Sequence, residues 1–239
     1  MPRKPAPSAV TAGIDEAGRG ALAGPVVAGA CILPKDIPLP RFIRDSKVLT
    51  PDVREEAFAW IAAHCAYGAG IVEADFIDLH GILPATERAM QQAVAELAQR
   101  CRPTYLLVDG RDKFWFDYPH TAIIDGDALE PCISAASIVA KVTRDRLMVD
   151  LAKAFPHYGL EGHKGYGTPE HFTAIRTLGP CRIHRCTFLS SIATTALPPA
   201  GTAEANTADP LRARATGAQE SGCLARAQTP RKSGARRTG

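Results

Sequence analysis

Gly13-Ile14-Asp15-Glu16-Ala17-Gly18-Arg19-Gly20 sets two adjacent carboxylates at the end of an apolar strand and follows them with an arginine between two glycines. The glycines have no side chain that would keep a phosphate away from the backbone amides. The carboxylates would repel that phosphate unless divalent cations bind to them and reverse the local charge. The stretch therefore indicates a sheet protein that uses metal ions to cleave phosphodiesters.

Two other interpretations compete for this stretch. Gly18–Gly24 could be the glycine loop of a dinucleotide-binding fold, but that loop has to lead into a helix. The next run, Pro25–Leu33, is apolar with β-branched residues, which favours a hairpin between two strands. An acidic surface turn is the second alternative, and acids at other strand ends would argue against it.

Two further strand ends carry acids. Tyr105–Asp109 is an apolar run that ends in Asp-Gly, and Thr121–Asp125 repeats the pattern before Gly126 and Asp127. A single Asp-Gly pair is weak support, because turns favour that pair in any protein. Acids at several strand ends are difficult to obtain from turns alone, so the joint pattern favours one site built by several strands.

From about Ala9 to about Phe188 the chain resembles the bacterial ribonuclease HII family. The motifs that carry the resemblance occur in the family's order: Gly13–Gly20, Asp45–Lys47, Leu107–Gly110, Gly126-Asp127, Ile133–Asp145, His163–Thr168 and His184-Arg185. The resemblance implies an α/β protein with the ribonuclease H-like fold. In that fold a mixed five-stranded sheet is flanked by helices, and a helical C-terminal extension covers the substrate groove.

The resemblance also implies an activity. The family cuts RNA strands paired with DNA, and it cuts on the 5′ side of single ribonucleotides embedded in duplex DNA, leaving a 3′-hydroxyl and a 5′-phosphate. This activity implies a role in ribonucleotide removal from DNA. Two rivals remain: a nucleic-acid binding protein without catalysis, and another two-metal nuclease of the same fold, such as a junction resolvase or an exonuclease.

By position, the family's catalytic, metal-binding acids fall on Asp15, Glu16, Asp109 and Asp127, the acids that the strand ends single out. They would hold Mg²⁺ or Mn²⁺, with two ions about 3.5 to 4 Å apart that stabilise the charge of the transition state. Asp125 stands where the family usually has a lysine, and we assign it no metal role. The presence of all four acids argues against a binding protein that lacks catalysis.

The same resemblance assigns substrate binding to Gly18, Arg19, Gly20, Ser46, Lys47 and Tyr166. The 2′-hydroxyl is the group that distinguishes RNA from DNA, and the backbone of Gly18–Gly20 is suited to bind it. Tyr166 lies between two glycines, which favours a displayed ring, and the family places this ring against the sugar of the adjoining deoxynucleotide. Both features favour ribonucleotide-directed cleavage over the other nucleases.

Periodicity and β-propensity predict the secondary structure. The expected strands are residues 11–17, 26–33, 66–73, 105–109 and 121–124, the first three as a meander. The expected helices are residues 52–64, 84–100, 134–155 and 169–177.

Composition predicts one catalytic domain over residues 9–197, between a flexible N-terminus (1–8) and a disordered basic tail (198–239). The tail has a net charge of +4, which leaves residues 1–197 at −1. A near-neutral domain that binds nucleic acid must gather its positive charge on one face. The candidates are Arg19, Arg44, Lys47, Lys141, Arg144, Lys164 and Arg185.

The chain lacks a run of eighteen apolar residues and a signal-peptide pattern, so we expect a soluble, cytoplasmic monomer. The chain has seven cysteines, an odd number, and none of them are spaced as CxxC. This pattern argues for reduced thiols and against a disulfide framework. Cys181, His184 and Cys186 are close in sequence, but a zinc site would need a fourth ligand and better spacing. Ordinary packing and substrate contacts are therefore the favoured interpretation of this group.

Overall fold

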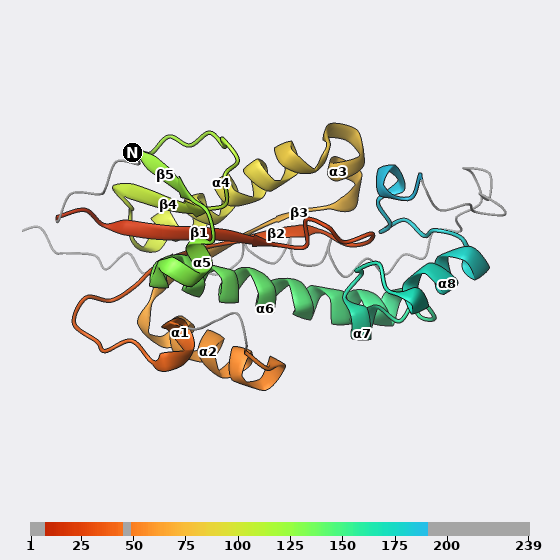
Figure 1. The fold of residues 1–239 in the computed structure, drawn as a ribbon, viewed down its shortest axis with the longest axis horizontal. Helices are drawn as coiled ribbons and strands as arrows, with labels where there is room; N and C mark the ends of the chain where they lie inside the picture. Colours follow the sequence, from red (N-terminus) through yellow and green to blue (C-terminus); the bar gives the residue numbers. More distant parts are fainter. Residues whose placement is uncertain (1–7, 45–48, 191–239) are drawn as a thin grey trace, which may run out of the picture. The chain divides into compact units, whose positions relative to one another are not determined.

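The computed structural model describes residues 8–44 and 49–190, which lie in the first of two units, 1–199 and 200–239. These residues form an α/β fold around a five-stranded sheet with the order β3-β2-β1-β4-β5 (Figure 1). The strand bounds are β1 Thr11–Ala17, β2 Val26–Ile32, β3 Ala66–Val72, β4 Tyr105–Asp109 and β5 His120–Ile123.

The sheet is mixed. β1, β2 and β3 form an antiparallel meander, β4 runs parallel to β1, and β5 runs parallel to β4. The register pairs Glu16 with Ala28, so the chain reverses direction across the glycine-rich segment 18–24. The predicted hairpin is confirmed, and the dinucleotide-binding interpretation fails because a strand, not a helix, follows the glycines.

Helices cover both faces of the sheet. Their bounds are α1 Arg41–Arg44, α2 Pro51–His64, α3 Ala74–His80, α4 Ile82–Arg100, α5 Gly126–Leu129, α6 Pro131–Ala154, α7 Leu160–His163, α8 Pro169–Leu178 and the 3-10 helix η2 Cys186–Phe188. α3 and α4 lie on one face, and α6 crosses the other face with α1 and α2 packed against it (Figure 1). α7, α8 and η2 form the predicted C-terminal extension.

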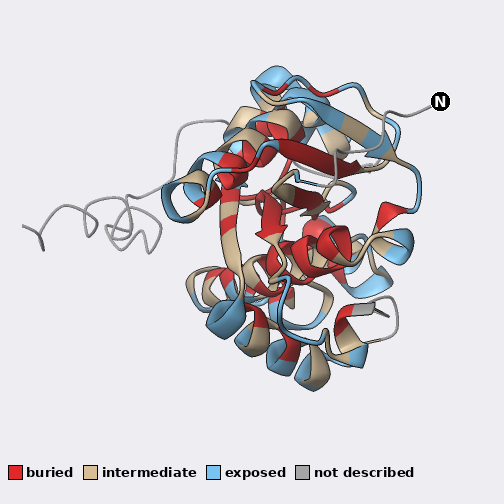
Figure 2. Ribbon diagram, turned by 90° about the vertical axis from the view of Figure 1, so that its left-hand side faces the viewer, coloured by how far each residue is buried: buried red, intermediate tan, exposed pale blue. Residues whose placement is uncertain are grey.

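The hydrophobic core consists of two layers, one on each face of the sheet. Figure 2 shows the buried residues concentrated on the strands and on the helix faces turned towards them. Ala89, Ala93 and Leu97 follow each other at one-turn spacing on α4 and pack with Ile14 and Leu106 of the sheet. Burial of aliphatic side chains of this size contributes about 1.5–3 kcal/mol each, so α4 and α6 are fixed firmly on the sheet.

Two of the helices begin at a Thr-Pro pair. Thr50 Oγ1 accepts a hydrogen bond from the Val53 N–H at 3.4 Å, and Thr168 Oγ1 accepts one from the His171 N–H at 3.3 Å. The threonine satisfies a backbone donor of the first turn, and the proline that follows suits the first helical position. The N-cap of α8, Thr168, thus lies two residues after Tyr166.

α6 approaches the sheet unusually closely. An ideal Cβ at Gly29 would lie 2.2 Å from the carbonyl oxygen of Ala136, and one at Gly13 would lie 2.1 Å from the carbonyl carbon of Cys132. Any side chain at residue 29 would therefore force the helix away from β1 and β2. This contact brings the next residue of α6, Ser137, to the strand that carries the two adjacent acids.

The predicted strands agree with the observed bounds to within one residue, and the four predicted helices to within three. The sequence does not predict α1, α3, α5 and α7, because helices of four to seven residues are too short to show a helical period. None of the helices within 8–44 and 49–190 combines the length and hydropathy that a membrane span requires.

Candidate active site

Two of the predicted acids lie side by side on neighbouring strands. The parallel pairing of β1 with β4 ends at Ile14 and Val108, and Asp15 and Asp109 occupy the next position of each strand. Alternate residues share a face of a strand, so Asp15 is on the face where Gly13 meets α6. Leu107 packs with Cys132 and Ile133 of the same helix, which puts Asp109 on that face as well.

Asp15 is buried, with 7% of its surface exposed. Its Oδ1 accepts a hydrogen bond from the Glu16 N–H at 2.7 Å, and its carboxyl group also bonds with the Ser137 side chain. Burial raises the pKa of Asp15 well above its usual range, and the charges of Glu16 and Asp109 raise it further. The ionised form of Asp15 is therefore destabilised in the folded protein, and perturbed pKa values of this kind are typical of functional sites.

Glu16 points to the opposite face of β1 and contacts the arginine of the glycine-rich loop. Arg19 Nη1 lies 3.1 Å from Glu16 Oε1 and 2.8 Å from Asp112 Oδ2. Burial raises the pKa of Glu16, and the hydrogen bond and charge of Arg19 partly oppose that rise. Arg19 thus links the loop after β1 to the loop after β4, which carries Asp112.

Asp109 is held by backbone donors at the start of α5. Its Oδ1 accepts a hydrogen bond from the Asp127 N–H at 3.2 Å, and the amides of Gly110 and Gly126 also bond to it. Burial raises the pKa of Asp109, the charge of Asp127 adds to this rise, and the three amides oppose it. Asp125 is exposed and adopts a left-handed conformation, with φ 55°, one residue before α5.

The four acids supply carboxylate oxygens, which are suitable ligands for a hard divalent cation. Within the described residues no three acidic, histidine or cysteine side chains are already grouped closely enough to hold a metal ion. After burial, the charges of Glu16 and Asp109 raise the pKa of Asp15, and the charge of Asp127 raises that of Asp109, so negative charge is concentrated around Asp15 and Asp109. Carboxylate oxygens are the ligands that Mg²⁺ and Mn²⁺ prefer, so the chemistry of these side chains fits either ion.

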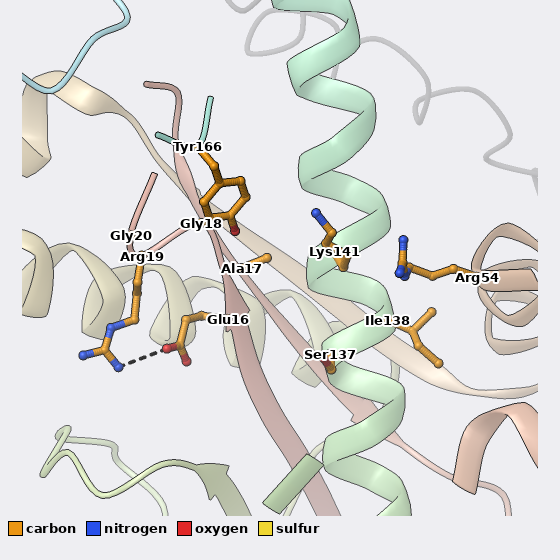
Figure 3. Close-up of a pocket in the computed structure, with 10 residues that line it drawn as sticks. All are labelled: Glu16, Ala17, Gly18, Arg19, Gly20, Arg54, Ser137, Ile138, Lys141 and Tyr166. Atoms are coloured by element: carbon orange, nitrogen blue, oxygen red, sulfur yellow. Dashed lines mark hydrogen bonds and ion pairs between the residues drawn. The ribbon is translucent and has the colours of Figure 1, made fainter. Parts of the chain in front are cut away.

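An open pocket of about 370 Å³ lies beside these acids (Figure 3). It is lined by Glu16, Ala17, Gly18, Arg19, Gly20, Arg54, Ser137, Ile138, Lys141 and Tyr166. Ser137, Ile138 and Lys141 come from one side of α6, and Arg54 approaches from α2 (Figure 3). The pocket therefore joins a carboxylate, the glycine-rich loop, an aromatic ring and two cations.

The two glycines of the Gly18-Arg19-Gly20 loop serve different purposes. Gly18 has φ +92°, and an ideal Cβ there would lie 2.0 Å from Nε of Arg144. Gly18 is thus required by the packing of the protein itself. An ideal Cβ at Gly20 would have no heavy atom within 4 Å, so this residue leaves open space at the pocket.

Tyr166 is half-buried and its ring lies near two cations of α6. Arg144 Cζ is 5.1 Å from the ring centroid, and Lys141 Nζ is 5.6 Å from it. Both distances are compatible with cation–π contacts, which hold the ring at the edge of the pocket. The prediction that Tyr166 is displayed is thus consistent with its position among the pocket residues.

The prediction that Arg144 and Arg185 contribute to a positively charged surface is wrong. Arg144 and Arg185 are fully buried, with 0% exposed surface. Arg144 donates to the carbonyls of Ala23, Pro25 and Lys164 at 2.9–3.1 Å. Burial, followed by the charge of Arg144, lowers the pKa of Arg185 to about 9.

Arg185 supports the glycine-rich loop from behind. It donates to the carbonyls of Arg19 and Gly24 at 2.9–3.0 Å. With Arg144 it therefore holds the loop and the Tyr166 segment in place. Arginines normally lie at the surface, so composition alone assigned both of them to the phosphate-binding face.

The remaining residues predicted to bind substrate or phosphate differ in whether the structure describes them and in whether they reach the pocket. Ser46 and Lys47 lie outside the described residues, as does the side chain of Arg44. Lys141 is paired with Asp145 at 2.7 Å and still lines the pocket. Lys164 donates to the carbonyl of Glu161 through its side chain.

Sequence reasoning missed Arg54, Asp112 and Ser137. Ser137 precedes Lys141 by one helical turn, so helical spacing within the Ile133–Asp145 motif could have found it. Asp112 follows Asp109 in an irregular loop, and Arg54 belongs to a helix distant in sequence. Neither position carries a signal that spacing could detect.

The group around Cys181 is a packing cluster. His184 Nδ1 accepts a hydrogen bond from the Cys181 N–H at 3.0 Å, and its Nε2 lies 3.1 Å from Nε2 of His171. Cys186 is exposed, and its N–H donates to Asp78 at 2.8 Å. Both ring nitrogens of His184 are thus engaged by neighbouring protein groups, which is consistent with the interpretation as packing.

Comparison with known proteins gives consistent matches. A family model described as Ribonuclease HII matches residues 12–191. The Ribonuclease HII of Geotalea uraniireducens (strain Rf4) is 53% identical over 181 residues, which cover 75% of this chain and 82% of that protein. The ribonuclease H2 of Pyrococcus horikoshii OT3 is similar in structure, with a TM-score of 0.59 and 28% identity over 74% of this chain and 92% of that chain.

The structure of the PCNA:RNase HII complex from Archaeoglobus fulgidus contains a further similar fold. It has a TM-score of 0.65 and 24% identity, and the match covers 79% of this chain and 98% of that chain. At this level of identity the similarity supports the fold alone.

Proposed function

The chain belongs to the ribonuclease HII family, and from that premise we propose that it cuts 5′ of ribonucleotides embedded in duplex DNA as well as within RNA/DNA hybrids. Membership makes the chain a ribonuclease H, a hydrolase that acts on RNA paired with DNA. Its products would carry 3′-hydroxyl and 5′-phosphate ends, and its role would be the removal of ribonucleotides from DNA. The supporting observation is that Glu16, Gly18–Gly20 and Tyr166 line one pocket.

The proposed catalytic residues are Asp15, Glu16, Asp109 and Asp127, which would hold two Mg²⁺ or Mn²⁺ ions. Bound ions of this kind activate water for attack and stabilise the negative charge that develops on the phosphate. The amide of Glu16 and the side chain of Ser137 orient the Asp15 carboxylate. Backbone amides at the start of α5 orient Asp109 in the same way.

Selection of the ribonucleotide would occur in the glycine-rich loop. The 2′-hydroxyl is both donor and acceptor, so backbone groups of Gly18, Arg19 and Gly20 can bind it. The carbonyl of Arg19 already accepts a hydrogen bond from Arg185, and that of Gly18 accepts one from the Ala21 N–H, so the amides of the loop and the Gly20 carbonyl are the better candidates. The open space at Gly20 would admit the sugar.

Tyr166 would stack against the sugar of the deoxynucleotide next to the ribonucleotide. Its ring lies beside Gly18 and faces Lys141 of α6 (Figure 3). Lys141 and Arg54, with Ser46 and Lys47, would bind neighbouring phosphates, which attract lysine and arginine irrespective of sequence. The pair of Lys141 with Asp145 leaves the lysine partly exposed for this purpose.

We also propose that residues 9–197 act alone as the catalytic domain. The family model covers 12–191, so the N-terminal residues 1–8 and the basic residues 198–239 lie almost wholly outside the matched part. We propose that this domain works as a cytoplasmic monomer that binds RNA/DNA hybrids and DNA duplexes containing ribonucleotides.

The test is to map the cut on a DNA duplex that contains one ribonucleotide. We expect a single incision 5′ of that ribonucleotide in Mg²⁺ or Mn²⁺, with a 3′-hydroxyl and a 5′-phosphate. An all-DNA duplex of the same sequence is the control and should remain intact. Incision of the control, or cutting of hybrids without any cut at the single ribonucleotide, would contradict the proposal.

A further inference from the structure

Three histidines lie behind the segment that carries Tyr166. The rings of His163 and His171 stack with their centroids 4.3 Å apart, and His171 contacts His184 on its other side. His171 and His184 are buried, and neither belongs to the residues that line the pocket beside the acids. The proposed cleavage gives none of the three histidines a role.

The hydrogen-bond donors around these rings determine which ring nitrogen of each histidine carries the proton. The backbone N–H of Cys181 donates to Nδ1 of His184 at 3.0 Å, which is shorter than the 3.3 Å from this nitrogen to the Cys181 carbonyl, so we assign no proton to Nδ1. A neutral His184 therefore carries its proton on Nε2, which lies 3.1 Å from Nε2 of His171. His171 accepts there, so its own proton is on Nδ1 and is donated to the Tyr166 carbonyl at 2.9 Å.

This order of donors requires both rings to be neutral. A second proton on His171 would place an N–H group on its Nε2, directly opposite the N–H group on Nε2 of His184, and the two would repel each other. A second proton on His184 would oppose the N–H of Cys181. Burial lowers the pKa of His171, and burial with the charge of His171 lowers the pKa of His184 to about 4. Both rings are therefore neutral at pH 7.

The hydrogen bonds fix the backbone on both sides of the Tyr166 ring. The Tyr166 carbonyl also accepts from the Thr168 N–H at 2.9 Å, and the Gly165 N–H donates to Nδ1 of His163 at 3.1 Å. An aromatic ring whose backbone is already fixed loses little conformational freedom when it stacks on a ligand. The histidines thus act on substrate recognition from behind the contact surface.

We propose that His171 is a positioning residue for ribonucleotide recognition, which fixes Tyr166 through its carbonyl while His184 keeps the His171 proton on Nδ1. The inference rests on the proposed function of Tyr166 at the junction between RNA and DNA. Loss of the bond should loosen the Tyr166 ring and weaken recognition of that junction. The acids, and the cleavage step that depends on them, should be unaffected.

The tautomers can be observed directly in the full chain. Nitrogen NMR of the histidine rings at pH 7.5 should show His171 protonated on Nδ1 and His184 protonated on Nε2. The variants His171→Asn and His184→Gln assign the two sets of signals. A His171 ring that carries its proton on Nε2 would overturn the proposal, because that ring could not donate to Tyr166.

A pair of variants tests the consequence for recognition. The Asn side chain places its amide near the position of the histidine Nδ1, whereas the Gln amide lies near Nε2. His171→Asn should therefore keep the bond to the Tyr166 carbonyl, and His171→Gln should lose it while retaining a polar group towards His184. Both variants lose the ring, so His171→Asn is the matched control for lost packing.

The measurement is kcat and KM for a duplex with one ribonucleotide and for a long RNA/DNA hybrid. His171→Gln should lower kcat/KM on the first substrate about five- to tenfold relative to the hybrid, mainly through KM. His171→Asn should keep the wild-type ratio. The ratio between substrates does not depend on how much of each variant is folded.

Tyr166→Ala, measured in parallel, separates the two proposals. If Tyr166→Ala leaves the ratio unchanged, the proposed role of Tyr166 fails and this inference fails with it. If Tyr166→Ala lowers the ratio while His171→Gln does not, only the inference is overturned. Equal losses in His171→Asn and His171→Gln would also overturn it, because packing alone would then explain the effect.

Discussion

Asp15 and Asp109 occupy adjacent positions on the parallel strands β1 and β4, one residue beyond the last pair of the ladder. Neighbouring strands are about 4.8 Å apart, so two carboxylates at this position repel each other unless a cation or a proton intervenes. Burial raises the pKa of Asp15, and the charges of Glu16 and then Asp109 raise it further. Metal dependence is therefore the first property to test.

Asp109→Asn should abolish cleavage while leaving duplex binding largely intact. The amide keeps the shape of the side chain but loses the charge that a divalent cation requires. Cleavage of the single-ribonucleotide duplex should also cease in excess EDTA and return when Mg²⁺ or Mn²⁺ is added. Wild-type rates in EDTA, or a fully active Asp109→Asn protein, would contradict the metal mechanism.

Tyr166→Ala should remove the stacking surface for the sugar. We expect kcat/KM on the single-ribonucleotide substrate to fall by the equivalent of roughly 1–3 kcal/mol, as for aromatic contacts to bases. Tyr166→Phe, which keeps the ring, should lose less. The same assay on a long hybrid is the control, and equal losses on the two substrates would mean that Tyr166 supports the site generally.

Gly18→Ala and Gly20→Ala should separate folding from substrate access. Alanine at residue 18 meets Arg144 and a positive φ, so we expect a loss of about 3 kcal/mol in the free energy of unfolding. Alanine at residue 20 meets no atom within 4 Å and should change stability by less than about 0.5 kcal/mol.

The activities of the two variants complete this comparison. Gly20→Ala should fold normally and cleave at least about tenfold more slowly, because the methyl group enters the space proposed for the sugar. Denaturant unfolding and cleavage kinetics measure the two effects. A normally folded and fully active Gly20→Ala protein would refute the assignment of that space to substrate.

The buried His184 should make stability fall in mild acid. Its pKa is lowered to about 4 in the folded protein, whereas an unfolded histidine titrates near 6.5. The unfolded chain therefore binds the proton first, and this contribution to stability is complete above pH 6.5 and lost as the pH falls towards 4. Between pH 7.5 and pH 5 the loss from this group should be about 2 kcal/mol.

The measurement is urea unfolding at several pH values. His184→Gln is the control, because a glutamine cannot titrate and its curve should lack this part of the pH dependence. Wild-type and His184→Gln proteins whose stabilities fall in parallel between pH 7.5 and pH 5 would show that His184 is not the responsible group.

Deletion of residues 198–239 should preserve cooperative unfolding and cleavage. The deleted part carries a net charge of +4, so its removal should weaken duplex binding at low salt and have little effect at high salt. Binding isotherms over a salt series and denaturant unfolding check both parts. A truncated protein without a cooperative transition would show that the tail belongs to the fold.

The sheet and its acids could be predicted because they depend on local patterns. Apolar runs that end in Asp-Gly identify β4 and the approach to α5, and helical spacing of apolar residues identifies α4. The position of Asp109 next to Asp15 then follows from parallel strands meeting at one edge of the sheet.

Other parts of the site could not be predicted, because they depend on contacts between distant residues. Arg144 and Arg185 have the composition of a phosphate-binding face, yet backbone carbonyls of the 19–25 loop satisfy their donors inside the protein. Ser137 reaches Asp15 only because α6 packs closely on the sheet. The tautomers of His171 and His184 depend on the direction of one backbone amide, that of Cys181.

Gly29, the partner of Asp15 in the β1–β2 ladder, sets how high α6 stands above the strand that carries the acids. Substitution there would lift the helix and, with it, the serine that touches Asp15. A change at this spacer position would therefore disturb the orientation of Asp15 without altering any group proposed to contact nucleic acid. Searches for altered turnover should include such remote spacers along with the residues of the pocket.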